Sequence, residues 1–202
     1  LKGGMMCQDI FVEVGHGPTL IDNNILLSDA SLRFATQGVA MVHNLILGAF
    51  TMVGSGVDNW VDGREQRRYT PYHIRHRTEV AGMMTILHGD NRFYNNIFVQ
   101  GHPITNEEPK ESPFYQQVGT HVWDEYPTYK EWIAKFDMEE EKPDMGKLEP
   151  AHFSHLPVWA DGNVYLAGAK AWKKEKHNLV KDDADVQIEL VEEDGQYRLS
   201  TN

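Results

Sequence analysis

A short phrase occurs three times in the first half of the chain, at residues 22–27, 42–47 and 94–99. Each copy holds a polar pair that ends in Asn, followed by three large apolar residues. Asn24 and Asn44 are 20 residues apart, and Asn44 and Asn96 are 52 apart. Self-similarity near 20 residues is typical of one coil of a solenoid, so the longer gap is expected to hold two coils and an insertion. The phrase predicts an all-β fold, a parallel β-helix.

Short apolar segments separated by Asn, Asp and Gly support this prediction. Such residues punctuate strands because they accommodate turn backbones. If the Asn residues occupy equivalent points on successive coils, their side-chain amides can bond from coil to coil as a ladder. A β-sandwich with Asn-rich turns is the alternative. The expected strands in the first half are 10–14, 19–21, 25–27, 31–34, 39–42, 45–47, 83–87, 93–94 and 97–99.

The later sequence changes character twice, and it predicts three regions: coils over 1–105, a connecting segment over 106–155, and a β-sandwich portion over 156–202. Prolines and the acidic run 139–141 mark the connecting segment, where 128–136 could form a short helix with Thr128 and Glu131 as its capping box. Alternation over 186–190, followed by Asp194-Gly195, predicts a β-hairpin. A hairpin alone cannot bury both faces, which suggests the start of a sandwich.

Composition excludes several classes of protein. The chain of 202 residues is 41% apolar, enough for a packed core, and has no apolar run long enough for a membrane helix. A net charge of −11 argues against nucleic-acid binding. The single cysteine, Cys7, cannot form an internal disulfide framework. The chain begins at Leu1 in what reads as mid-domain sequence, so we expect a fragment, whose compartment (periplasmic, secreted or cytoplasmic in a bacterium) stays open.

The first candidate for chemistry is Glu13. On a strand, Phe11, Glu13 and Gly15 share one face, while Val12 and Val14 face the interior. A carboxyl group beside an aromatic ring and shielded from water has a raised pKa, which suits a general acid. The alternative is an exposed strand residue without a role.

The second candidate is the segment 70–79, which gathers His, Arg, Tyr and Glu side chains within ten residues. Such a segment can bind sugar hydroxyls or an anion. His73, His76 and Glu79 would fit a helical metal site, but Pro71 and β-branched neighbours disfavour a helix, and no metal is assigned. The segment could also be a solvated charged loop. A long excursion from a rigid scaffold often carries binding residues.

Two further features are interpreted structurally. Asp90 and Arg92 flank a turn and are expected to brace it by hydrogen bonds. The four later tryptophans could stack on sugar rings, but such residues more often pack a core, so none is assigned to a site: Trp123, Trp132, Trp159 and Trp172.

Five segments, in this order, resemble parallel-β-helix glycoside hydrolases. They are FVEVGHGP (11–18), VHNLILG (42–48), RRYTPYHIRHRTEVAG (67–82), GDNRFYNNIFVQG (89–101) and LPVWADGNVYLAGAKAW (156–172). The chain resembles the β-xylosidase family, glycoside hydrolase family 120, in which a right-handed β-helix carries a β-sandwich flank, so a right-handed β-helix is expected here. The resemblance covers essentially the whole chain.

This resemblance implies a retaining, exo-acting hydrolase of β-xylosides or xylo-oligosaccharides, with two carboxylates about 5–5.5 Å apart. Glu13 matches the acid/base, and the Asp nucleophile, one coil upstream, would precede Leu1. The expected sugar-binding rim is His16, Tyr72, His73, His76 and Glu79. A rival assignment pairs Asp58 or Asp62 with Glu79, but an irregular loop places carboxylates less accurately.

Other functions stay open. A non-catalytic carbohydrate-binding β-helix is one alternative, and a polysaccharide lyase using the Arg64–Arg77 cluster is another, although no calcium-ligand repeat is visible. No cofactor is expected. The expected partners are an oligosaccharide or glycoside substrate and the rest of the same polypeptide, not nucleic acid or a membrane. A homo-oligomer stays open.

Overall fold

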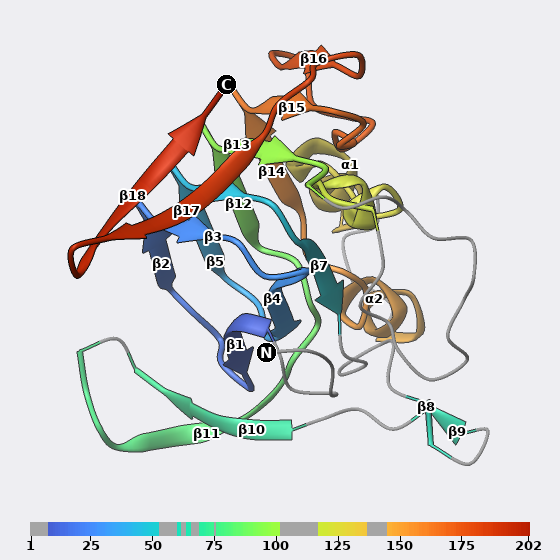
Figure 1. Cartoon of the computed structure of the whole chain (residues 1–202). Helices are drawn as coiled ribbons and strands as arrows, with labels where there is room; N and C mark the ends of the chain where they lie inside the picture. The colour runs from blue at the N-terminus through green and yellow to red at the C-terminus, as the bar shows by residue number, and fades with distance from the viewer. Residues whose placement is uncertain are drawn as a thin grey trace.

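A computed structural model describes residues 8–52, 60–61, 64–65, 69–74, 76–101, 117–136 and 145–202. Most of the elements are strands, and the expected all-β class is confirmed. Three parallel sheets form the body (Figure 1). The chain contributes one strand to the first, second and third sheet in turn and then returns to the first. The first sheet contains β1 (Gln8–Glu13), β4 (Ala30–Ala35) and β7 (Ala49–Met52). Among the described residues, no helix is both long and apolar enough to span a membrane.

The other two sheets have the same parallel arrangement. The second sheet contains β2 (Thr19–Asp22), β5 (Val39–Val42), β12 (Asn91–Tyr94) and β14 (Val158–Asp161). The third contains β3 (Ile25–Leu26), β6 (Leu45–Ile46), β13 (Ile97–Val99), β15 (Val164–Leu166) and β16 (Leu179–Lys181). Each passage of the chain through the three sheets, called a coil below, therefore lies directly on the previous one.

Inward-facing aromatic residues fill the space between the sheets. Phe34, Phe50, Phe93 and Phe98 come from β4, β7, β12 and β13, and each is at most 1% exposed. Phe50 meets Phe34 and Phe98 edge-on, with ring centroids 5.4 and 5.6 Å apart, as aromatic rings prefer. Trp123, from the 3-10 helix η2 (His121–Trp123), closes this core and lies 4.6 Å from the ring of Phe93.

The recurring Asn residues form the expected ladder. The side-chain amide nitrogen of Asn24 donates to Oδ1 of Asn44 at 3.1 Å, and that of Asn44 donates to Oδ1 of Asn96 at 2.9 Å. Asn96 donates to a fourth rung, Asn163, at 3.0 Å, and Asn163 donates to Oε1 of Glu175 at 2.8 Å. Glu175 accepts at the end of the ladder because a carboxylate has acceptors only. The ladder thus satisfies buried polar groups at the same corner of four coils.

The prediction that two coils and an insertion lie between Asn44 and Asn96 is wrong. Those two residues are hydrogen-bonded neighbours, so the 52 residues hold one coil and a long insertion, not two coils. Residues 83–87, expected as a coil strand, contribute instead to β11 (Val80–Thr85), which pairs in antiparallel fashion with β10 (Tyr69–His73). Antiparallel pairing between these two strands takes both away from the parallel sheets. Two short strands, β8 (Trp60–Val61) and β9 (Arg64–Glu65), pair in the same insertion.

The parallel sheets continue further along the chain than residue 105. Strand β14 pairs with β12, and β15 pairs with β13, so residues 158–166 add another coil instead of opening a new sheet system. Between the coils lie α1 (Tyr129–Ile133), the 3-10 helix η3 (Ala134–Phe136) and α2 (Met145–His152). The short helix and its capping box are confirmed, since Thr128 accepts from the Glu131 amide and Glu131 accepts from the Thr128 amide.

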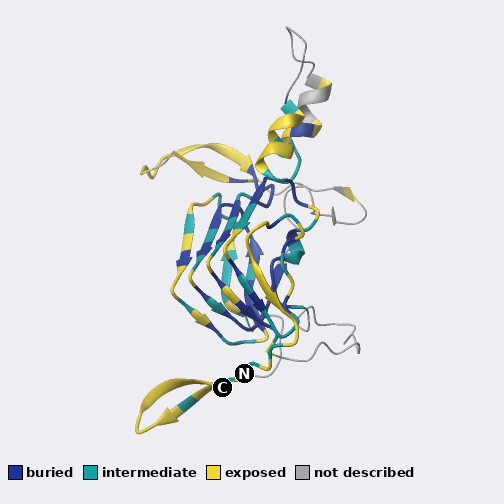
Figure 2. Cartoon of the chain, turned by 90° about the horizontal axis from the view of Figure 1, so that it is seen from above, coloured by how far each residue is buried: buried dark blue, intermediate teal, exposed yellow. Residues whose placement is uncertain are grey.

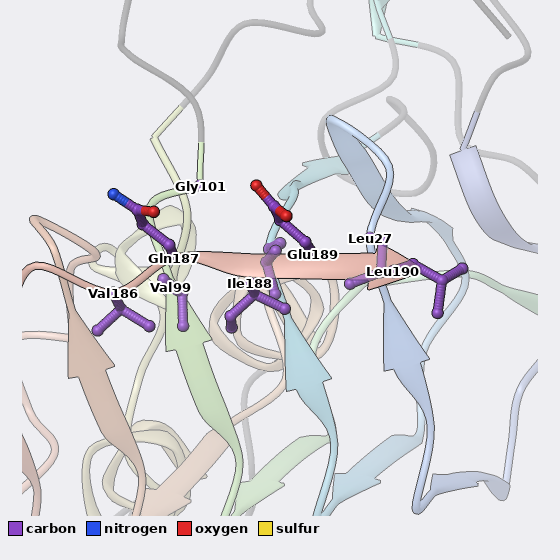
Figure 3. Close-up of a pocket in the computed structure, with 9 residues that line it drawn as sticks. Leu27, Val99, Gly101, Val186, Gln187, Ile188, Glu189 and Leu190 are labelled. Carbon is purple, nitrogen blue, oxygen red and sulfur yellow. The ribbon is translucent and has the colours of Figure 1, made fainter. Parts of the chain in front are cut away.

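The predicted hairpin at the end of the chain is also confirmed. Strands β17 (Ile188–Glu193) and β18 (Gln196–Thr201) pair in antiparallel fashion around Asp194-Gly195, which both have positive φ angles. The hairpin is largely exposed and projects from the body (Figure 2). Strand β17 crosses the ends of the third sheet over a cavity of about 400 Å³. In Figure 3, Val186 and Ile188 point toward those strand ends, and Gln187 and Glu189 point away.

Candidate functional site

Glu13 lies at the last position of β1, with its side chain exposed. The strand pairs with β4 along its length, and Glu13 is opposite Ala35. Ile10 and Val12 contact the core, so the alternate residues, Phe11 and Glu13, face outward as expected. The Phe11 ring lies 5.3 Å from the guanidinium carbon of Arg33 on the neighbouring strand. Glu13 is therefore an outward-facing carboxylate held on a paired strand.

The chain turns sharply after Glu13. Val14, which was expected to continue the strand, has a φ of 44° and begins the turn instead. The next coil holds this turn, because the Thr36 hydroxyl donates to the Gly15 carbonyl at 2.7 Å and the Val14 amide donates to the Ala35 carbonyl at 2.9 Å. A side chain on Gly17 would collide with the backbone of Gly38. Glycine at position 17 thus permits the close approach of the two coils.

The turn brings His16 against the β10–β11 hairpin. Its Nε2 lies 2.6 Å from the Thr70 hydroxyl, and its ring meets Tyr72 edge-on at a centroid distance of 5.9 Å. Burial lowers the pKa of His16, which favours a neutral imidazole. Its Nδ1 is buried with no hydrogen-bond partner among the described residues. The structure therefore joins two segments that are 54 residues apart in the chain.

The remaining expected rim residues lie further along the hairpin. His73 is the last residue of β10, after a register shift, while His76 and Glu79 lie in the connection to β11; all three are exposed. A metal site at these three residues would require a helix, but the segment is part of a β-hairpin. The structure shows no cluster of three metal-ligating side chains within the ranges it describes. Asp58 and Asp62, of the rival carboxylate pair, lie outside the described residues.

Thr70 is a member of this site that sequence reasoning did not select. It is 7% exposed and holds His16, whereas the expected rim residues around it are exposed. Alternation along β10 places Thr70 and Tyr72 on the same face. Had residues 69–73 been predicted as a strand, this spacing would have placed Thr70 beside Tyr72. Only the fold shows that this face is directed at His16.

Asp90 and Arg92 brace their turn, as expected. Arg92 Nη1 donates to the Asp90 backbone carbonyl at 2.8 Å and lies 3.0 Å from its carboxylate.

The four later tryptophans divide into two groups. Trp123 and Trp172 are at most 3% exposed and belong to the core, while Trp132 and Trp159 are partly exposed at the surface. The expectation of core packing therefore describes only two of the four.

Comparison with known proteins adds one finding. No family model matches the chain, and no curated protein matches it. Among solved structures, the chain is similar to XylC, whose structure was determined as a complex with xylose, with 35% sequence identity and a TM-score of 0.74. The similarity covers 96% of this chain and 26% of that one, so the chain spans about a quarter of the length of its structural neighbour. The chain therefore shares its fold with part of a protein seen with a bound sugar.

Proposed function

We propose that this chain is part of a retaining, exo-acting glycoside hydrolase of β-xylosides and xylo-oligosaccharides. The observation that carries the proposal is the 35% identity, over 96% of the chain, to a protein solved with xylose. In this proposal the three sheets are coils of a right-handed parallel β-helix in the β-xylosidase family of glycoside hydrolases. The β17–β18 hairpin then begins a β-sandwich that other parts of the protein complete.

Glu13 is the general acid/base in this mechanism. Its carboxyl group protonates the glycosidic oxygen while an aspartate attacks the anomeric carbon, so the leaving alcohol departs and a glycosyl-enzyme ester forms. Glu13 then removes a proton from water, which attacks the anomeric carbon of the glycosyl-enzyme, displaces the aspartate and releases the sugar with its configuration retained. The aspartate belongs to a coil that precedes β1. Support for this role comes from the outward direction of Glu13 and its position at the end of a strand paired along its length.

The turn after Glu13 and the hairpin form the sugar-binding rim. His16 and Tyr72 are in ring contact beside the end of β1, and Tyr72 is 37% exposed, which leaves part of its ring available to a sugar. His73, His76 and Glu79 extend the same rim along the hairpin and contact more distant parts of the substrate. A neutral His16 keeps its hydrogen bond to the Thr70 hydroxyl and so holds the turn against the hairpin, which fixes the shape of the rim.

The proposal is tested by hydrolysis of nitrophenyl glycosides by the complete natural protein and its variants. Glu13→Gln keeps the shape of the side chain and removes its proton chemistry. Loss of a positioned general acid/base typically costs about 10²–10⁴-fold in rate, so we expect kcat on nitrophenyl β-xyloside to fall by at least about 100-fold, because hydrolysis of the glycosyl-enzyme loses its general base. Added azide should restore turnover of Glu13→Gln by forming a β-xylosyl azide, since a small anion needs no general base.

Glu79→Gln is the matched control, because it makes the same chemical change at an exposed residue of the hairpin. We expect it to raise KM and to leave kcat within a few-fold of the wild type. A Glu13→Gln enzyme with full activity, alongside an inactive Glu79→Gln enzyme, would transfer the acid/base role to the rival pair. A wild-type protein that binds xylo-oligosaccharides but cleaves no glycoside would instead be a non-catalytic binding module.

A further inference from the structure

A second groove lies at one edge of the second sheet, and the turn that carries His16 lies at the other edge. The groove is between β14 and α1 and has a volume of about 480 Å³. In the sheet order β14-β12-β5-β2, this groove is at the β14 edge, whereas the turn after Glu13 leads into β2 at the other edge. The lining residues used below are Tyr94, Tyr129, Trp159, Asp161, Lys174 and His177. None of them belongs to the site proposed around Glu13.

Aromatic rings form one wall of this groove. Trp159 on β14 and Tyr129 on α1 have centroids 6.3 Å apart and planes inclined by 25°, so they present two nearly parallel surfaces. Arg92, opposite Trp159 in the sheet, lies over the indole with its guanidinium carbon 4.3 Å from the ring centroid. This contact holds the ring in place, as cation–π contacts do. Tyr129 is 52% exposed and Trp159 is partly exposed, so solvent reaches both rings.

Polar groups lie beside the rings. Asp161 pairs with His177 at 2.9 Å, and its side chain is 51% exposed. Tyr94 faces Asp161 across the sheet, and burial raises the pKa of its phenol, which keeps the hydroxyl group protonated at neutral pH. Lys174 donates to the Tyr126 carbonyl at 2.9 Å and to Glu131 at 2.6 Å, so its charge is already paired. Lys130 and Lys176 also line the groove, so it offers hydrogen-bonding groups of several kinds beside the rings.

Such a combination of aromatic rings and polar groups matches a sugar. A pyranose has flat C–H faces, which pack on aromatic rings, and hydroxyl groups around its edge, which bond to carboxylate, imidazole and phenol groups. Concave sites that recognise small ligands combine an apolar wall with a few convergent polar groups in the same way.

We propose that this groove is a secondary binding site for a β-linked xylo-oligosaccharide, separate from the site at Glu13. The choice of a neutral, xylose-containing ligand rests on the function proposed above, whereas the prediction of a sugar rests on the groove alone. A secondary site of this kind holds the polymer at the protein surface while chain ends reach the reactive carboxylates.

The groove aromatics also attach α1 to the sheet, so the test must separate binding from packing. Trp132 provides the control. It is on the same helix, its ring is 6.1 Å from that of Tyr129, and it does not line the groove. Trp132→Ala therefore weakens the helix packing and spares the proposed binding surface. Trp159→Ala and Tyr129→Ala remove the binding surface from two different elements.

Binding should be measured by titration calorimetry of the complete natural protein with a thio-linked xylo-oligosaccharide, which is not hydrolysed. The wild type should bind two molecules per chain, and Trp159→Ala and Tyr129→Ala should bind one, with affinity at the lost site reduced by at least about tenfold. Trp132→Ala should keep both sites, even with a lower melting temperature. The inference is overturned if all three variants bind alike, or if the wild type has a single site that Trp159→Ala leaves intact.

These outcomes are distinguishable from failure of the proposed function. If Glu13→Gln retains full hydrolytic activity, the catalytic assignment fails, yet Trp159-dependent binding still supports the groove. If Glu13→Gln is inactive and the groove variants retain both sites, the groove proposal fails and the catalytic assignment stands.

Discussion

Removal of a central rung from the Asn ladder should destabilise the protein strongly. Asn96 is fully buried, and its side chain makes four hydrogen bonds. Its Oδ1 accepts from the backbone and side-chain amides of Asn44, at 3.0 and 2.9 Å. Its Nδ2 donates to the Met41 carbonyl at 2.9 Å and to Oδ1 of Asn163 at 3.0 Å. Asn96→Ala removes all four of these bonds from the interior.

The expected loss follows from those contacts. A typical hydrogen bond contributes about 1 kcal/mol net to stability, so four bonds correspond to about 4 kcal/mol. The buried backbone amide of Asn44 also loses its acceptor, and an unsatisfied buried donor carries its own cost. Since natural domains are stable by about 5–15 kcal/mol, this single change should remove a large part of the total.

Asn24→Ala is the matched control, because Asn24 is the first described rung and is only partly buried. It loses two side-chain hydrogen bonds, to Asp22 and Asn44, and water can replace part of them. We expect a loss of about 1 kcal/mol. Urea unfolding followed by circular dichroism at 218 nm should therefore place Asn96→Ala about 3 kcal/mol below Asn24→Ala.

Asn96→Asp separates hydrogen bonding from volume. The carboxylate keeps the shape and both accepted bonds, but it cannot donate to Met41 or Asn163 and faces their oxygens instead. We expect it to be at least as destabilising as Asn96→Ala at neutral pH and less so in acid. Equal stabilities for Asn96→Ala and Asn24→Ala would refute the ladder as a source of stability.

Two further predictions concern the coils and the candidate site. Gly48→Ala should cost at least about 2 kcal/mol of unfolding free energy, because the new methyl group would collide with the Ser28 carbonyl. The control, Gly101→Ala, would meet only the Leu47 side chain at 3.4 Å and should be nearly neutral. Similar melting temperatures for the two variants would contradict this reasoning. The pKa of His16 is lowered from 6.5 by burial, so its neutral ring contributes stability above about pH 6.5 that is lost as pH falls through the folded-state pKa. The melting-temperature difference between wild type and His16→Asn should therefore shrink from pH 8 to pH 5, and a difference that does not change with pH would show that protonation of His16 is not linked to folding.

Local sequence was sufficient for elements whose determinants lie within a few residues. The capping box at Thr128 and Glu131 needs two side chains and one turn of helix, and it forms as expected. The hairpin around Asp194-Gly195 needs two residues that accept positive φ, and it also forms. The Asn phrases mark coil corners because the residue before each Asn has a positive φ; these residues are Asn23, His43 and Asn95.

The same phrase could have identified the fourth rung. Gly162-Asn163 is followed by three apolar or aromatic residues, and Gly162 has a φ of 72° at the same corner. The end of the ladder could not be found in this way. Glu175 occurs in a different local sequence, and only the fold places its carboxylate beneath Asn163 and within 2.7 Å of the Tyr165 hydroxyl.

By itself, then, the sequence determined most strands of the first half and the Asn corners, since these depend on residue type and short spacing. It did not predict β7 or β10, nor the single coil between Asn44 and Asn96. Tertiary structure decided which partner each segment meets. Residues 83–87 are apolar enough for a coil strand, yet pairing with β10 draws part of this run into an outlying hairpin. That hairpin in turn brings Thr70 to His16. Apolar pattern predicts that a segment is a strand, but the choice among possible strand partners depends on contacts between residues far apart in the chain, which no local pattern encodes.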